Sequence, residues 1–257
     1  MISFRSFAPG IAAGILLFIF CAMLLPTAAG QVVATAGLVY VMLLCGGCVA
    51  GILAGVLIWL FTRNSSTLKN AFKIFFGNFY SDEKQTFITG LMHGLSKHTW
   101  EIFQTALGHT WLQLQNIFHA DKRVAYCSGA VFLILQNQKK RKGVTIGTFI
   151  NVFIKDKIEG DFEKAVTSGM LFMHEYGHTF DSRIYGIFFL PLIGLPSLIS
   201  AATAKPVEGT KGVLTHDYRW YEMSANRHAA RYFKKYYSFD WKVFEDLYPL
   251  QKPSDYA

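Results

Sequence analysis

Residues 38–61, LVYVMLLCGGCVAGILAGVLIWLF, are the central part of a stretch from Ser6 to Thr62 that contains no charged side chain. A helix needs about 20 apolar residues to cross a bilayer, so the whole stretch suffices for two crossings and a turn. We therefore expect a transmembrane helical hairpin within residues 1–63, with helices over residues 8–25 and 38–61. The break between them is expected around Pro26 and Gln31.

The charges that flank this hairpin indicate its orientation. Arg5 precedes it, Arg63 and Lys69 follow it, and the loop between its helices carries no charge. Because basic flanks tend to stay in the cytoplasm, we expect an integral protein of a plasma or inner membrane whose C-terminal domain faces the cytoplasm. An alternative is a signal peptide cleaved near residues 27–29, which would leave the second helix as an anchor.

One face of the second helix has no side chains. Gly47, Gly51 and Gly55 recur every four residues, so another helix can approach this face closely. The pattern predicts packing against the first helix or contact between copies, that is, an oligomer. A small channel or transport accessory built on this face is a further possibility, and it predicts that a chain lacking residues 1–62 has no function.

Residues 64–257 contain nearly all of the charges and all eight histidines, as expected of a folded domain. We expect an α+β fold with helices over residues 64–80 and 83–119. Two β-like runs, residues 124–135 and 144–154, would form a hairpin whose basic turn is residues 136–143. The net charge of +8 suits attraction to the lipid bilayer, and no nucleic-acid-binding motif accompanies it, so nucleic acid is not an expected partner.

The sequence HEYGH, His174 to His178, lies within residues 161–183, which are expected to form a helix capped by Asp161 and stopped at Gly186. Two histidines four residues apart project from one face of a helix and can bind one Zn²⁺. Glu175 lies about 100° further round the helix, close to such a metal. Two buried, hydrogen-bonded histidines without a metal would produce the same pattern.

A second helix, expected over residues 217–236, carries Glu222 and Asn226, again four residues apart. Together with HEYGH, it resembles the gluzincin metallopeptidases, in which HExxH precedes a glutamate ligand in an ExxxD, ExxAD or ExxAN helix. The tethered architecture is similar to that of HtpX-like membrane enzymes. The resemblance implies a zincin-like domain with zinc bound by His174, His178 and Glu222. Asn226 stands where the family usually has an aspartate that orients a ligand histidine, so weaker zinc binding is expected.

The same resemblance implies a mechanism, the hydrolysis of peptide bonds in a protein or peptide substrate by a zinc-activated water. Glu175 would be the general base. The oxyanion needs a further donor, for which His228, Arg227 and Tyr218 are the nearest candidates by position, and His228 is the first choice. An extended substrate would pair with residues 144–154 as an added strand, and the alternative is that this run is an ordinary buried strand.

We expect His216 to be an ordinary surface residue at the start of its helix. Asp181, three residues after His178, is expected to be a solvated charge at a helix end, and the alternative is a hydrogen-bond partner that orients a ligand histidine. The competing function is a non-catalytic membrane protein, a sensor, scaffold or immunity-type partner, whose HExxH helix is vestigial or structural. In that case Glu175→Gln leaves its function intact.

The uncharged segment from Ile184 to Ala204 tests the zinc hypothesis. A single membrane crossing here would place Glu222 on the opposite side from the two histidines, and the segment is too short for two crossings. Its glycines and prolines favour a broken, non-spanning segment that is buried in the domain or lies against the bilayer. They are Gly186, Pro191, Gly194 and Pro196.

Overall fold

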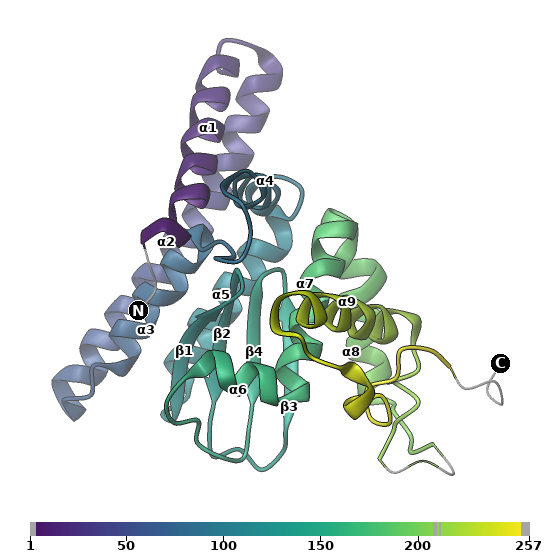
Figure 1. The fold of residues 1–257 in the computed structure, drawn as a ribbon. Helices are drawn as coiled ribbons and strands as arrows, with labels where there is room; N and C mark the ends of the chain where they lie inside the picture. The colour runs from purple at the N-terminus through teal and green to yellow at the C-terminus, as the bar shows by residue number, and fades with distance from the viewer. Residues whose placement is uncertain (1–3, 208–209, 211, 253–257) are drawn as a thin grey trace.

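The computed structural model describes residues 4–207, 210 and 212–252. It is mostly helical, with one four-stranded sheet and a long helical hairpin that projects from the rest of the molecule (Figure 1). The hairpin consists of α1 (Ala8–Leu24) and α2 (Ala28–Thr62). Both helices are long and apolar enough to cross a membrane, as the sequence predicted.

α2 begins at Ala28, well before the predicted start near residue 38. The Thr27 side chain caps it by accepting a hydrogen bond from the Gly30 backbone N–H at 2.9 Å. Gln31, which was expected in the break, therefore lies inside the helix. With 35 residues, α2 is about 52 Å long, which exceeds the hydrocarbon core of about 30 Å.

The glycine face of α2 packs within the chain. Gly47 lies against His109 of α5 (Ile102–Phe118), and Gly55 lies against Leu68 of α3 (Ser66–Phe76). A Cβ atom at Gly55 would be 2.7 Å from the Leu68 backbone, so the approach requires glycine. This face thus fastens the membrane hairpin to the domain, and its partners are α3 and α5.

The sheet has the strand order β1-β2-β4-β3. β1 (Lys122–Cys127) and β2 (Ala130–Leu135) form one antiparallel hairpin, β3 (Lys142–Ile146) and β4 (Phe149–Phe153) form another, and parallel pairing of β2 with β4 joins them. The prediction of a single hairpin with a basic turn was therefore wrong. Each β-like run folds back on itself at a two-residue turn, because Ser128, Gly129 and Gly147 adopt positive φ.

Helices cover both faces of the sheet, in three layers (Figure 1). β2 is buried throughout, so its alternate residues enter two different cores. Val131 and Leu133 pack with α3 and α5, whereas Phe132 and Ile134 pack with α6 (Phe162–Ser168), α7 (Met170–Tyr185) and α9 (Trp220–Tyr237). β3 is an edge strand that lies beside α7, and this places a free sheet edge next to HEYGH.

The expected helix over residues 161–183 is two helices, because the chain breaks at Gly169 between α6 and α7. Asp161 caps the first of them, as predicted, by accepting the Glu163 N–H at 3.0 Å. α7 ends at Tyr185, and Gly186 follows with a φ of 50°. HEYGH therefore lies in the middle of its own helix.

The segment after α7 is bent. It consists of η3 (Gly186–Phe188), the π-helical turn η4 (Leu190–Gly194) and α8 (Leu195–Ala202), and the axis turns by 119° after Phe188. The chain returns toward α7 and continues into α9. Glu222 consequently lies beside the two histidines, which excludes a single crossing between them.

Candidate metal centre

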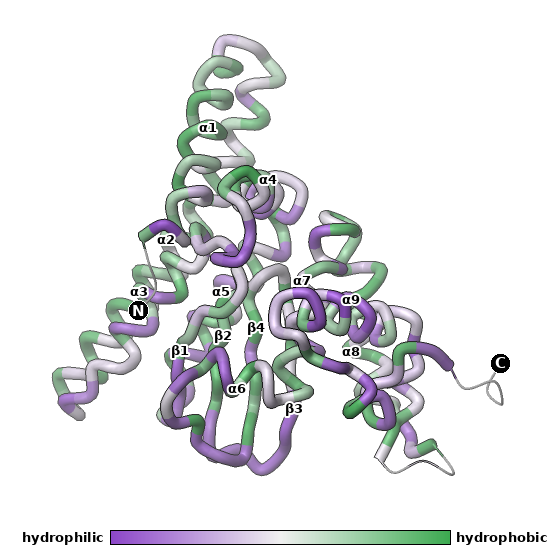
Figure 2. The backbone as a smooth tube through the Cα atoms, viewed as in Figure 1, coloured by the Kyte–Doolittle hydropathy of each residue, from purple (hydrophilic) through white to green (hydrophobic). Residues whose placement is uncertain are grey.

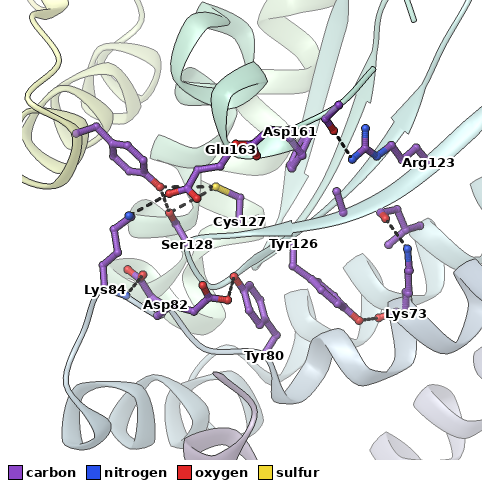
Figure 3. A pocket seen from close by; sticks show the side chains of 16 residues that line it. Lys73, Tyr80, Asp82, Lys84, Arg123, Tyr126, Cys127, Ser128, Asp161 and Glu163 are labelled. Carbon is purple, nitrogen blue, oxygen red and sulfur yellow. Dashed lines mark hydrogen bonds and ion pairs between the residues drawn. The ribbon is translucent and has the colours of Figure 1, made fainter. Parts of the chain in front are cut away.

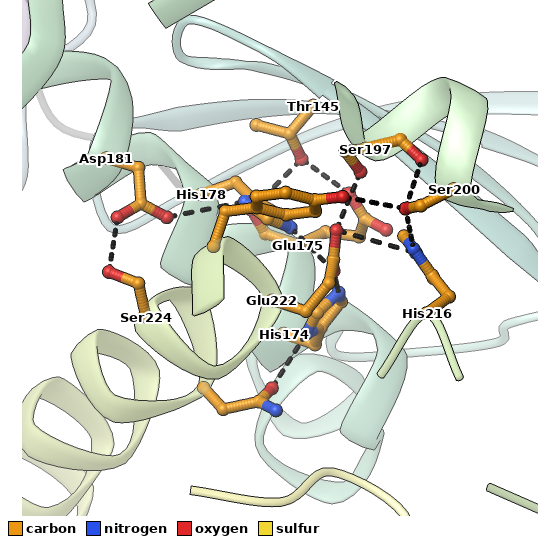
Figure 4. Close-up of polar contacts among 12 residues, drawn as sticks. Thr145, His174, Glu175, His178, Asp181, Ser197, Ser200, His216, Glu222 and Ser224 are labelled. Carbon is orange, nitrogen blue, oxygen red and sulfur yellow. Dashed lines mark hydrogen bonds and ion pairs between the residues drawn. The ribbon is translucent and has the colours of Figure 1, made fainter. Parts of the chain in front are cut away.

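The two halves of the motif meet where α7 and α9 cross. Glu222 Oε2 lies 3.2 Å from His174 Nε2 and 3.3 Å from His178 Nε2 (Figure 4). One ligand atom from each of the three residues lies within 4.8 Å of the others. Among the described residues, these three form the His/Asp/Glu/Cys group whose geometry can hold a metal ion.

The crossing of α7 and α9 depends on Gly177, inside the motif. A Cβ atom at this position would lie 2.0 Å from the carbonyl oxygen of Ala225 in α9. The two backbones are therefore in direct contact, one residue from His178 and three from Glu222. No pattern in the sequence indicates this role for Gly177.

Gly177→Ala is expected to destabilise the protein by about 1–3 kcal/mol or more, because the added methyl group forces the helices apart. Helix propensity alone would predict the opposite change in stability, because it favours alanine over glycine by about 1 kcal/mol. The melting temperature in detergent measures the effect. Gly46→Ala in α2 is the matched control, since nothing lies within 4 Å of its added Cβ atom. A Gly177→Ala variant as stable as the wild type would contradict the tight crossing.

The other ring nitrogen of each histidine is held by an oxygen atom. His174 Nδ1 lies 2.7 Å from Asn226 Oδ1, and His178 Nδ1 lies 3.4 Å from Asp181 Oδ2. Such partners orient metal-ligating histidines and leave Nε2 directed at the metal. Asp181 is fully buried and also accepts a hydrogen bond from Ser224, so the expectation of a solvated helix-end charge was wrong.

Asn226 has two roles that an aspartate would not combine. Its Oδ1 faces His174, while its Nδ2 donates a hydrogen bond of 2.9 Å to the carbonyl oxygen of Pro249. An ionised carboxylate has no proton to donate to that carbonyl. The asparagine that replaces the aspartate of the gluzincin pattern thus connects His174 to the C-terminal segment.

The three groups are electrostatically complementary. Burial opposes ionisation of Glu222, but the adjacent imidazoles of His178 and His174 hold its pKa well below the usual range. Burial lowers the pKa values of both histidines. Glu222 more than compensates at His174, whose pKa is raised, and Glu222 together with Asp181 raises the pKa of His178 well above normal. Nitrogen and carboxylate ligands of this kind suit Zn²⁺, which binds by displacing the imidazole protons.

Glu175 lies at the edge of the same site, held by β3. The Thr145 hydroxyl donates a hydrogen bond of 2.6 Å to Glu175 Oε2 (Figure 4). A Cβ atom at Gly143 would lie 2.2 Å from Glu175 Oε1, so the carboxylate occupies the space that a side chain would fill. These β3 residues line a cavity of about 130 Å³ together with His174, Glu175 and His178.

The opposite wall of the cavity comes from the bent segment and the loop before α9. The Ser197 hydroxyl donates to Glu222 Oε1 at 2.6 Å, and His216 Nε2 lies 3.4 Å from the same oxygen. His216 Nδ1 in turn lies 2.6 Å from the Ser200 hydroxyl. His216 lines the cavity, so its predicted surface location was wrong.

The structure does not bring His228 to the cavity. Its ring stacks on Phe180, with centroids 5.5 Å apart, and its Nε2 lies 3.6 Å from Asp181. Tyr248, which no motif signalled, lies closer to the metal centre. Its ring centroid is 5.1 Å from that of His174, and burial together with the nearby Glu175 raises its pKa to about 12.

A larger cavity, of about 470 Å³, lies at the β1 edge of the sheet (Figure 3). Its charged groups have partners in the fold. Lys84 and Glu163 form an ion pair of 3.0 Å, and Arg123 donates to the carbonyl oxygens of Ile158 and Gly160. This cavity does not contain the residues of the metal centre.

Comparisons of the chain with protein-family models, with curated proteins and with solved structures give no match. The function is therefore inferred from the residues of the site and from their geometry.

Proposed function

We propose that the protein is a membrane-anchored zinc metallopeptidase that hydrolyses peptide bonds in a protein or peptide substrate. The observation that carries this proposal is the convergence of His174, His178 and Glu222 in a cavity that also contains Glu175. Three protein ligands leave a position open for water or substrate, which is typical of catalytic zinc sites.

The chain supplies the remaining parts of a hydrolytic site. A bound Zn²⁺ provides Lewis acidity, which polarises a substrate carbonyl and activates water near neutral pH. Glu175 accepts the proton of the attacking water and delivers it to the leaving amine, while Thr145 keeps the carboxylate oriented. We assign stabilisation of the oxyanion to His216 instead of His228, because His216 lines the cavity.

The free edge of β3 supports a peptide as the substrate. β3 pairs with β4 on one side only, and its residues Gly143, Val144 and Thr145 border the cavity. An extended peptide that adds to this edge gains backbone hydrogen bonds and passes beside Glu175. The cytoplasmic orientation of the domain belongs to the proposal and rests on the basic flanks of the hairpin.

Zinc removal tests the proposal. The purified protein in nanodiscs is expected to hold about one zinc per chain and to hydrolyse members of a fluorogenic peptide library. A chelator should abolish hydrolysis, and added zinc should restore it. Elemental analysis and the peptide assay are run on the same samples. A wild-type chain that binds no zinc when the metal is supplied would rule out the proposed enzyme.

A non-catalytic membrane protein is the second candidate. The observation in its favour is that Glu222 Oε2 lies within hydrogen-bond distance of both imidazoles, so the three side chains can satisfy one another as a structural cluster. If this cluster were only structural, zinc would not raise the melting temperature. A metal centre predicts a higher melting temperature with zinc, because a ligand that binds only the folded state stabilises it.

A further inference from the structure

The bent segment between α7 and α9 exposes apolar side chains along its outer face. The side chains here called the outer face have exposed fractions from 39% to 57% and are Ile184, Ile187, Phe188, Leu192, Leu195 and Ile199. Leu198, which also borders the cavity, is 64% exposed. No charged residue lies between Arg183 and Lys205. Such a concentration of exposed apolar surface marks an interaction site.

The inner face of the same segment already has its packing partners. Phe189 and Ile193 are buried and form a small core with Tyr221 of α9. Ile193 and Leu198 also line the cavity of the metal centre. The outer face is therefore not required to complete the domain core, and it lies directly behind the wall of the cavity.

A chain of contacts connects this outer face to the membrane hairpin. α4 (Phe87–His98) packs against α1, where Gly94 lies against Ala13. Trp100, just after α4, donates a hydrogen bond of 3.1 Å to the carbonyl oxygen of Arg183, and its ring centroid is 6.3 Å from that of Phe188. The bend between α7 and α8 points toward the same end of the molecule as α1 and α2, and is similarly hydrophobic (Figures 1 and 2).

We propose that the outer face of the bent segment lies in the interfacial region of the same bilayer that α1 and α2 cross. The segment is helical through most of its length, so its backbone groups are satisfied internally, as lipid contact requires. Trp100 is 41% exposed beside it and suits the membrane–water interface. The occupant of this surface is lipid, because the hairpin holds the domain against a bilayer.

This location specifies a substrate class, an inference that rests on the proposed peptidase function. Since Ile193 and Leu198 line the cavity, its wall would lie at the membrane surface. Substrates would then be extended peptide segments next to a membrane-spanning helix or a lipid anchor. A soluble peptide would reach the site without help from the outer face.

A fluorescent label at Leu195 tests the lipid contact. Leu195→Cys is made with Cys21→Ala and Cys45→Ala, because the other two cysteines are buried, and is labelled with NBD in nanodiscs. The matched control is Val243→Cys, whose native side chain is 76% exposed in η5 (Trp241–Phe244). We expect blue-shifted emission and quenching of about twofold or more at position 195 by shallow spin-labelled lipids, with neither at position 243.

Two outcomes would overturn the proposal. Equal emission and quenching at positions 195 and 243 would place the outer face in water. Stronger quenching by deep than by shallow spin labels would indicate a segment inserted into the hydrocarbon core.

The substrate class is tested separately. Leu195→Lys is expected to slow cleavage of a lipid-anchored peptide about tenfold, through weaker interfacial binding. Cleavage of the same peptide without its lipid anchor should be unchanged. Equal rates for wild type and variant on the anchored peptide would refute the proposed substrate class. Zinc content is measured in every sample, so absence of zinc with a lipid-embedded label would refute the peptidase proposal alone.

Discussion

Glu175→Gln is expected to lower peptide hydrolysis by about 100-fold or more while zinc content stays unchanged. The amide has nearly the shape of the carboxylate, so it fits the same space beside Gly143 and Thr145. It is not basic enough to accept the proton of the attacking water. The turnover rate on a fluorogenic peptide and the zinc content, measured on the same preparation, check the two parts of this prediction.

Glu163→Gln is the control for the loss of a carboxylate. Glu163 lies on α6, where it pairs with Lys84 and does not line the metal-centre cavity. We expect wild-type turnover and wild-type zinc content for this variant. If Glu175→Gln retained full turnover, Glu175 would not be the general base. Loss of zinc in Glu175→Gln would show a disturbed site and would also contradict the expected result.

Glu222→Ala is expected to remove most of the bound zinc. Two imidazoles from one helix remain, and they lack the third ligand and the negative charge that α9 provides. Zinc affinity should fall by more than the factor of about 10–100 that follows removal of a hydrogen-bond partner of a ligand. Competition between the protein and a chromogenic chelator measures the affinity, and elemental analysis measures the content.

The fold of the Glu222→Ala variant needs its own check, because Ser197 and His216 lose an acceptor. Glu222→Gln keeps an oxygen atom for Ser197 and removes only the charge, so it separates misfolding from loss of the ligand. Circular dichroism should show wild-type helix content for both variants, and Glu163→Ala should keep its zinc. Full zinc content in a folded Glu222→Ala variant would show that α9 does not supply the third ligand.

The metal-ligand candidates could be found from the sequence because their pattern is local. His174 and His178 share one helical face, as do Glu222 and Asn226, and a spacing of four residues is enough to infer this. Asn226 indeed lies at His174 Nδ1. The two helices that are long and apolar enough to span a membrane were predictable for a similar reason, since the length of an uncharged stretch can be read directly from the sequence and compared with the thickness of a bilayer.

The strand pairing was mispredicted for a physical reason. β2 is buried on both faces, so its sequence is apolar throughout and lacks the alternation that reveals a strand and its ends. Two strands joined by Ser128 and Gly129 therefore looked like one long strand. Which strands pair was decided by the helices that cover the sheet, and those contacts join residues far apart in the chain.

The sequence by itself determined the apolar helical hairpin, the two site helices and the residues on them that could hold a metal ion. Only the tertiary structure decided what surrounds them. Thr145 on β3, His216 before α9 and Tyr248 near the C-terminus have no mutual spacing that a reader of the sequence could recognise. They meet because α7 and α9 cross at Gly177 and the bent segment folds back. Helical periodicity acts over a few residues, whereas a cavity is formed by packing between distant segments.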